Sequence, residues 1–340
     1  MTTISLQDGH AAHAQPGHPE RPARLDAIRT AIETDPVLAA LPRLSGFPAS
    51  VDDLARVHPE AYLDLVETFC ATGGGQLDAD TYATAASWDV ARQACGDLLA
   101  LVDAVCTGGA RTAFALGRPP GHHARPFQAM GFCLIANVAV AARHAQAVHG
   151  AERVMIVDVD VHHGNGTQEV FEADPSVLFV SSHQADIYPG TGRLGETGVG
   201  AGEGLTVNLP VPGGTANNLV DLYRTVLPPL AERFRPDLVL VSAGYDGHYL
   251  DPLGSLGLSV TGLSDLLGVV HEAADRWAEG RMVLTLEGGY QAEALAACVA
   301  AALHRLIDPS ASVADPFGPT LLGSADLGPL TEAVRGLHGV

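Results

Sequence analysis

Short apolar runs alternate with longer amphipathic stretches along most of the chain. The amphipathic stretches, such as residues 88–102 and 219–230, carry apolar side chains at intervals of three and four, which predicts helices with one buried face. The apolar runs are typical of strands in a sheet that is covered on both faces. They are Thr112–Leu116, Val154–Val161, Val177–Ser181, Leu205–Leu209, Leu238–Ser242 and Met282–Leu286. The alternation of strands and helices predicts an α/β layered fold around a mostly parallel sheet.

The first hundred residues are predicted to be mainly helical. Residues 18–22 (HPERP) precede an apolar stripe formed by Leu25, Ile28 and Ile32, which has helical spacing. Three histidines, His10, His13 and His18, crowd this end of the chain. Nearby Gly and Pro residues break the helical geometry that a metal-binding pair would need, so we expect these histidines to be structural.

No linker, internal repeat or run of charge divides the sequence. We therefore expect a single domain over residues 1–340, with its core at about 10–306. The tail at about 309–340 is rich in Pro, Gly and Ala, and we expect it to be loosely packed.

Composition excludes several classes of protein. Hydrophobic residues make up 47% and charged residues 17% of the 340, which is typical of a globular chain. No apolar run reaches the roughly 18–20 residues of a membrane span, and the N-terminus lacks an apolar signal core, so we expect a cytoplasmic protein with no membrane partner. The five cysteines are odd in number and lack CxxC spacing, which argues against a disulfide framework and a Cys-rich zinc site.

The formal net charge is −20, and every basic residue is Arg. A charge this negative repels phosphate backbones and argues against direct nucleic-acid binding. It would attract a cationic substrate, although an acidic surface can equally serve only to keep a protein soluble.

The densest polar cluster directly follows one of the predicted strands. Because side chains alternate along a strand, Asp158, Asp160 and His162 are expected on one face. Two carboxylates and an imidazole gathered there would be strongly disfavoured without a cation. In parallel sheets, ligands lie beyond the carboxyl ends of the strands, where this cluster stands. The cluster therefore predicts a metal site.

A third ligand is expected from a neighbouring strand end. Asp246 follows the run Leu238–Ser242 and stands behind a glycine. Asp160, His162 and Asp246 would leave a coordination position open, which is the form of a catalytic zinc site. The oxygen ligands also suit Fe²⁺ or Mn²⁺.

Other polar groups supply acid–base chemistry. Two carboxylates nearly cancel the charge of a divalent ion, so a separate proton acceptor is needed, and His122 and His123 can provide it. Asp158 and Asn165 are available to orient the two imidazoles. Tyr290 follows a strand and two glycines, and its phenol suits a donor to a developing oxyanion.

With these residues together, the chain resembles the zinc-dependent histone deacetylase superfamily, which includes bacterial acetylpolyamine amidohydrolases and deacetylase-like amidohydrolases. The motifs occur in the family's order and cover roughly residues 10–306, and HHGNGTQ and DPLG resemble the class II branch. The matching stretches are HPERPARL (18–25), RPPGHHA (118–124), MGFC (130–133), DVDVHHGNGTQ (158–168), YPGTG (188–192), SAGYDGHYLDPLG (242–254) and EGGY (287–290).

The resemblance implies the three-layer arginase/deacetylase fold and hydrolysis of an N-acyl amide. The family's zinc ligands fall on Asp160, His162 and Asp246, its tandem histidines on His122 and His123, and its oxyanion tyrosine on Tyr290. Asp158 matches the aspartate that supports the first histidine. Asn165 stands where class I members carry Asp, a replacement usual in class II-like members.

The resemblance also implies an acyl-lysine tunnel. Phe132 matches one aromatic wall, and Tyr188 takes the place of the other, which is usually Phe. Gly131 would line the stem, and Asp80 resembles the aspartate at the rim. Leu253 stands at the lip where polyamine-selective relatives carry an acidic residue, which favours acyl-lysine over acetylpolyamine.

Two further features are implied by the resemblance alone. The family binds a monovalent cation, K⁺ or Na⁺, through oxygens near Asp158, Asp160, His162, Ser181 and Ser182. Arg24 matches an arginine that lines an internal cavity from which acetate leaves.

The expected function is therefore a zinc-dependent deacetylase with one Zn²⁺ per chain, which acts on acyl-lysine in proteins or peptides. An acetylpolyamine deacetylase is one alternative, and a catalytically silent metal- or ligand-binding protein on the same fold is another. The Lys-free, Ala-, Gly- and Arg-rich composition indicates a bacterial source with a GC-rich genome, which argues against histones as the natural target. An oligomer is compatible with the sequence.

Overall fold

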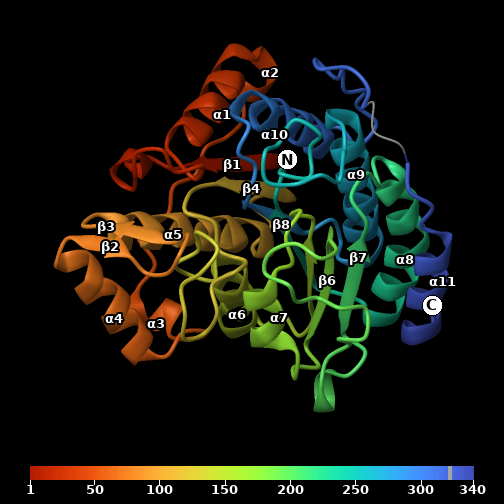
Figure 1. The fold of residues 1–340 in the computed structure, drawn as a ribbon, viewed down its shortest axis with the longest axis horizontal. Helices are drawn as coiled ribbons and strands as arrows, with labels where there is room; N and C mark the ends of the chain where they lie inside the picture. The colour runs from red at the N-terminus through yellow and green to blue at the C-terminus, as the bar shows by residue number, and fades with distance from the viewer. Residues whose placement is uncertain (321–323) are drawn as a thin grey trace.

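The computed structural model describes residues 1–320 and 324–340. Within them, seven parallel strands form one sheet in the order β1-β4-β9-β8-β5-β6-β7 (Figure 1). A short antiparallel pair, β2 (Gly74–Gln76) and β3 (Tyr82–Thr84), lies apart from it. The strands of the large sheet are β1 (Thr2–Leu6), β4 (Thr112–Leu116), β5 (Val154–Asp158), β6 (Val177–Gln184), β7 (Thr206–Val211), β8 (Leu238–Ala243) and β9 (Met282–Leu286).

Helices cover both faces of this sheet because each strand buries side chains on both sides. In β4, Phe114 and Leu116 belong to one hydrophobic core, and Ala113 and Ala115 belong to the other. The first core is covered by α1 (Ala23–Thr34), α8 (Asn218–Phe234), α9 (Val260–Trp277) and α10 (Ala292–Ile307), and the second by α4 (Glu60–Ala71), α5 (Ser87–Cys106), α6 (Asn137–His149) and α7 (Asn165–Phe171) (Figure 1). The predicted layered α/β fold is confirmed.

The remaining helices are short or peripheral. They are η1 (His10–Ala12), α2 (Pro36–Ala39), α3 (Val51–Leu54), η2 (Gly200–Gly202) and α11 (Gly328–His338). None of the helices in the described residues has the length and hydropathy of a membrane span.

Six of the seven strands overlap predicted apolar runs, although some of their ends differ, and the stripe Leu25, Ile28 and Ile32 is buried on α1 as predicted. The seventh strand, β1, was not predicted because its sequence, TTISL, contains three hydroxyl residues. Their side chains are nevertheless buried, and Thr2 Oγ1 donates to the carbonyl of Leu306 at 3.0 Å.

The prediction of a loosely packed tail is wrong for α11. This helix packs against α8 and β7, and Val334 is fully buried. Leu330, Val334 and Leu337 recur at helical spacing, but the Pro- and Gly-rich residues around them obscured the pattern. Residues 321–323 of the predicted tail lie outside the described residues.

Candidate active site

Four adjacent strands bring the predicted polar residues to one edge of the sheet. β4, β9, β8 and β5 are neighbours, and the loops that follow them contain residues 117–123, 287–290, 244–246 and 159–164 respectively. Because the strands are parallel, all four loops leave from the same edge, where α/β sheets bind ligands.

The predicted metal ligands converge. The ligand atoms of Asp160, His162 and Asp246 all lie within 4.8 Å of one another. His162 Nδ1 is 3.1 Å from Asp160 Oδ1 and 3.2 Å from Asp246 Oδ2. Both carboxylates are buried, and Asp246 Oδ2 has no hydrogen-bond partner among the described residues. An unpartnered buried carboxylate oxygen beside an imidazole fits a divalent metal ion.

The route by which these ligands converge differs from the prediction. The strand was expected to continue to Val161, with Asp160 and His162 on its face, but β5 ends at Asp158. The following loop folds back around carboxylates: Asp160 N donates to Asp158 Oδ1 at 3.1 Å, and Val161 N donates to Asp246 Oδ1 at 2.9 Å. Main-chain hydrogen bonds, and not strand alternation, position the ligands.

The electrostatics of this cluster favour a positive charge between the carboxylates. Burial and the neighbouring Asp160 raise the pKa of Asp246 to about 7. Burial opposes protonation of His162, but the neighbouring carboxylates of Asp160 and Asp246 outweigh it and raise its pKa to about 10. The main chain also packs closely against these carboxylates. A side chain at position 288 would not fit, because a Cβ on Gly288 would lie 2.1 Å from Asp246 Oδ2.

The two tandem histidines have different partners and different charge states. His122 Nδ1 is 2.9 Å from Asp158 Oδ2, and His123 Nδ1 is 2.8 Å from Asn165 Oδ1. Burial disfavours protonation of His122, but the carboxylates of Asp158 and Asp160 outweigh it and hold its pKa well above the usual range. Burial, together with the positive charges of His122 and His162, holds the pKa of His123 well below it.

His123 is therefore the neutral imidazole of the pair. Its Nδ1–H donates to the amide oxygen of Asn165, which leaves the lone pair on Nε2 free to accept a proton. A Cβ on Gly131 would lie 2.4 Å from His123 Cδ2, so only glycine lets the backbone approach this ring.

A cavity of about 260 Å³ leads to these groups. Tyr188 and Leu253 are partly exposed at its mouth, and the ring of Phe132 packs edge-on against Tyr290 with centroids 5.6 Å apart. The cavity is lined by all five predicted substrate-contacting residues, together with His123, His162, Ile187 and Tyr290; the five are Asp80, Gly131, Phe132, Tyr188 and Leu253.

The phenol of Tyr290 is a protonated group at neutral pH. Burial raises its pKa well above the usual range. Its main-chain N–H donates to Asp251 Oδ2 at 2.6 Å, and the guanidinium of Arg24 lies 4.9 Å from the ring centroid. The tyrosine therefore faces the cavity as a hydrogen-bond donor.

Comparisons with known proteins show the family to which the chain belongs. The sequence profile of the histone deacetylase domain matches residues 18–306. The chain is 39% identical to histone deacetylase 14, chloroplastic, of Arabidopsis thaliana, over 95% of this chain and 81% of that protein. It is 39% identical to a histone deacetylase-like amidohydrolase of Pseudomonas aeruginosa, over 89% of this chain and 80% of that protein.

A solved structure, the crystal structure of the HDA15 HD domain, matches this one with a TM-score of 0.88 at 36% identity, covering 99% of this chain and 95% of that one. The chain belongs to the histone deacetylase family. The family that the sequence resemblance indicated and the three-layer arginase/deacetylase fold that it implied are both confirmed. The bacterial source and the cytoplasmic location stay predictions.

In this histone deacetylase fold, several supporting residues were missed by the sequence analysis. Glu287 is fully buried and accepts hydrogen bonds from the main-chain N–H groups of Gly121 and His122 at 2.7 and 3.1 Å. Burial raises its pKa to about 7. Its position between a buried strand and two glycines was the available signal, and its role is to hold the loop that carries the tandem histidines.

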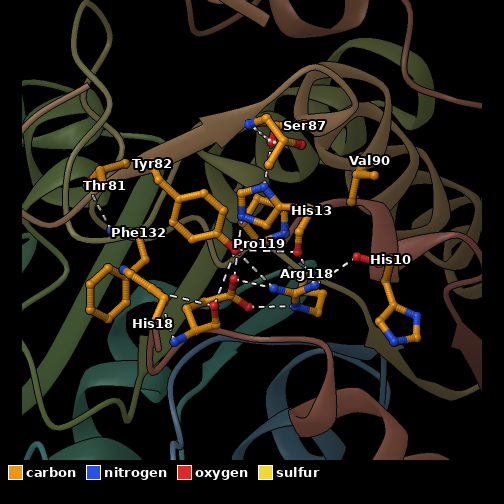
Figure 2. Close-up of polar contacts among 12 residues, drawn as sticks. His10, His13, His18, Thr81, Tyr82, Ser87, Val90, Arg118, Pro119 and Phe132 are labelled. Carbon is orange, nitrogen blue, oxygen red and sulfur yellow. Dashed lines mark hydrogen bonds and ion pairs between the residues drawn. The ribbon is translucent and has the colours of Figure 1, made fainter. Parts of the chain in front are cut away.

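A buried ion network ties the N-terminal segment to the same loop (Figure 2). Glu20 accepts from Arg118 Nε at 2.7 Å and Nη2 at 2.5 Å, and Arg24 Nη1 lies 3.3 Å from Glu20 Oε1. All three side chains are buried. His13 Nε2 is 3.4 Å from Glu20 Oε2, and the ring of His18 packs edge-on against Phe132 (Figure 2). His13 and His18 therefore make structural contacts, as was expected for the three N-terminal histidines.

Arg24 also supports the turn before Tyr290. Its Nε donates to the carbonyl of Gly289 and its Nη2 to that of Glu287, both at 2.5 Å. The predicted role of Arg24 in an acetate path stays a prediction.

The residues expected around a monovalent cation are neighbours. Asp158 of β5 pairs with Ser181 of β6, and Ser182 is also buried. Tyr223 donates to Ser182 Oγ at 2.9 Å. Binding of K⁺ or Na⁺ here stays a prediction.

Proposed function

We propose that this chain is a zinc-dependent amidohydrolase that removes acetyl or other acyl groups from acyl-lysine in peptides or proteins. One observation carries the proposal: the buried group of Asp160, His162 and Asp246 stands beside a narrow cavity that also exposes His123 and Tyr290. Membership of the histone deacetylase family supports a hydrolase.

Asp160, His162 and Asp246 would hold the metal ion. A bound zinc ion supplies a Lewis acid that polarises the amide carbonyl and acidifies water. Three protein ligands with an open position are typical of catalytic zinc, and Fe²⁺ also suits the oxygen-rich set.

The protein's own groups carry the proton transfers. His123 accepts a proton at Nε2 from the water that attacks the amide carbon, because its imidazole is neutral and faces the cavity. Tyr290 donates a hydrogen bond to the oxygen that becomes negative. The C–N bond then breaks as the leaving amine takes a proton from His123, or from His122, which Asp158 holds in its protonated form.

The shape of the cavity supports an acyl-lysine substrate. The aromatic rings of Phe132 and Tyr188, with Gly131, line a channel suited to an aliphatic stem. At its mouth, Leu253 presents an apolar side chain in place of an acidic one, so nothing at that position binds a second ammonium group.

An acetylpolyamine deacetylase is the second candidate, and the carboxylate of Asp80 in the cavity lining favours it. The net charge of −20 also attracts polyamines.

Rates on an acetyl-lysine peptide, N-acetylputrescine and N-acetylspermidine separate the candidates. We expect the larger kcat/KM for the peptide. A dominant polyamine rate would overturn the choice of lysine, and no hydrolysis across an acyl-substrate panel would favour a silent binding protein. Leu253→Glu should move the ratio of kcat/KM values toward polyamine, whereas Leu253→Gln, its uncharged match, should not.

A further inference from the structure

A second set of metal-ligating side chains lies between helices α5 and α6, which pack against each other (Figure 1). Asp103 is in the last turn of α5, and His144 and His149 are on α6. The Nε2 atoms of both histidines point at the same oxygen, Asp103 Oδ1, at distances of 2.7 and 2.6 Å. One ligand atom from each residue lies within 4.8 Å of the others.

The chemistry of this donor set points to a transition-metal ion. Two imidazole nitrogens and a carboxylate oxygen suit Zn²⁺, Co²⁺, Ni²⁺ or Cu²⁺, whereas Mg²⁺ and Ca²⁺ prefer oxygen ligands alone.

His144 has the surroundings of a metal ligand. Its side chain is 10% exposed, and its second ring nitrogen, Nδ1, has no hydrogen-bond partner among the described residues. That nitrogen lies 3.9 Å from Asp53 Oδ1 of α3. Metal-binding histidines commonly direct their other ring N–H at a carboxylate, which fixes the tautomer and leaves the lone pair for the metal. In this structure Nε2 donates to Asp103, so an ion would take the place of that proton, and a proton on Nδ1 would then leave Nε2 free to bind.

An ion can reach this position from solvent. The side chain of Asp103 is 49% exposed. His149, the last residue of α6, lines a surface cavity of about 290 Å³ together with Cys106 and Glu152. Water from this side can complete the coordination of an ion held by three protein ligands.

The position is separate from the candidate active site. α5 ends ahead of β4, and α6 ends ahead of β5, so both helices end at the amino edge of the sheet, whereas the active site lies beyond the carboxyl ends of the strands. We propose that Asp103, His144 and His149 form a second divalent metal site, which binds Zn²⁺ or a similar ion and links α5 to α6 without taking part in the reaction.

Zinc binding by the 340-residue chain tests this proposal. Equilibrium dialysis followed by elemental analysis should show a second Zn²⁺ per chain in the wild type, in addition to the ion of the candidate active site. His149→Ala should lower the affinity for this second ion by at least about tenfold, because even the loss of a residue that only orients a metal ligand lowers metal affinity by about 10–100-fold. Asp103→Asn, which keeps the shape of the side chain, should do the same.

His304→Ala is the matched control. His304 Nε2 lies 2.8 Å from Asp35 Oδ2, so this histidine also pairs with a carboxylate, but it belongs to no group of three ligands among the described residues. This variant should bind zinc as the wild type does.

Thermal melting with and without added Zn²⁺ gives a second measurement that does not depend on activity. With one equivalent of Zn²⁺ already held in the candidate active site, the wild type and His304→Ala should gain further stability as more zinc is added, and His149→Ala should lose that further gain. A second ion bound equally by His149→Ala and the wild type, or no second ion in either, would overturn the proposal. Neither result depends on whether the proposed hydrolase activity is correct.

Discussion

Replacing Glu20 with Gln tests how the N-terminal segment supports the active-site loop. The substitution keeps the shape of the side chain and removes its charge. In the wild type, Glu20 holds Arg118 through two hydrogen bonds of 2.7 and 2.5 Å, and Arg24 lies 3.3 Å away. The side chains of all three residues are at most 1% exposed, so Glu20→Gln leaves two guanidinium groups buried beside a neutral amide.

The expected cost is large because a buried charge loses its partner. Breaking a buried ion pair from one side costs about 3–5 kcal/mol. For a chain of 340 residues, an unfolding entropy of about 2.1 cal/mol/K per residue gives about 0.7 kcal/mol/K in total, so the melting temperature should fall by about 4–7 °C.

The effect should also depend on pH in a defined direction. Burial acts to raise the pKa of Glu20, but hydrogen bonds and charge from His13 and Arg118 outweigh it and hold the pKa far below its ordinary value of 4.5. A group whose pKa is lowered on folding contributes stability above its unfolded value and loses it as the pH falls toward the folded value. The difference between wild type and Glu20→Gln should therefore be constant near neutral pH and shrink below about pH 4.5.

Thermal denaturation followed by circular dichroism measures this difference. Glu33→Gln is the control, because Glu33 is an exposed carboxylate on α1, the helix that follows Glu20 in the chain, and its loss changes the net charge equally. Adding Arg118→Met to Glu20→Gln should recover part of the loss, since no charge at position 118 then stays unpaired. A Glu20→Gln protein that melts within about 1 °C of Glu33→Gln would refute the reasoning, since even 1 kcal/mol corresponds to about 1.4 °C here.

Further substitutions test the candidate site. Tyr290→Phe should lower kcat by about 10²–10³-fold with the metal content unchanged, because it removes one donor to the oxyanion; an undiminished rate would remove Tyr290 from the mechanism. Gly288→Ala places a Cβ 2.1 Å from Asp246 Oδ2 and should reduce the zinc retained after dialysis, as read by elemental analysis. Gly131→Ala places a Cβ 2.4 Å from His123 Cδ2, so kcat should fall while zinc is retained, and a normal rate would argue against His123 as the proton acceptor.

Much of the fold could be predicted because a parallel sheet covered on both faces needs short, continuously apolar strands. The strand β1 was not predicted because its hydroxyl residues leave no apolar run in the sequence. These side chains are nevertheless buried, and Thr2 Oγ1 forms a hydrogen bond of 2.9 Å with Thr112 Oγ1. The end of β5 was placed too late because Val159 and Val161 continue the apolar alternation, although both are buried in the loop that wraps around the carboxylates.

The residues of the candidate site also fall into those that the sequence could predict and those that it could not. Asp160, His162 and Asp246 could be singled out because polar groups at the ends of apolar strands are unusual in a sequence. Asp251 could not, because it is a single carboxylate whose importance lies in main-chain N–H groups from a distant segment. Glu287 does follow an apolar strand, but its partner Gly121 lies 166 residues earlier, so its role could not be read from its position. Asp251, for example, accepts from the N–H of Tyr290, 39 residues later. Such roles depend on tertiary contacts, and no local pattern encodes them.

The most direct test of the central claim is deacetylation of an acetyl-lysine peptide before chelation, after chelation and after zinc is restored. The account predicts that the activity disappears with the chelator and returns with about one equivalent of Zn²⁺ in the wild type and in His149→Ala, and that Asp246→Asn stays inactive at every zinc concentration. Full activity in the chelated protein, or a zinc-restored rate in Asp246→Asn equal to that of the wild type, would contradict it.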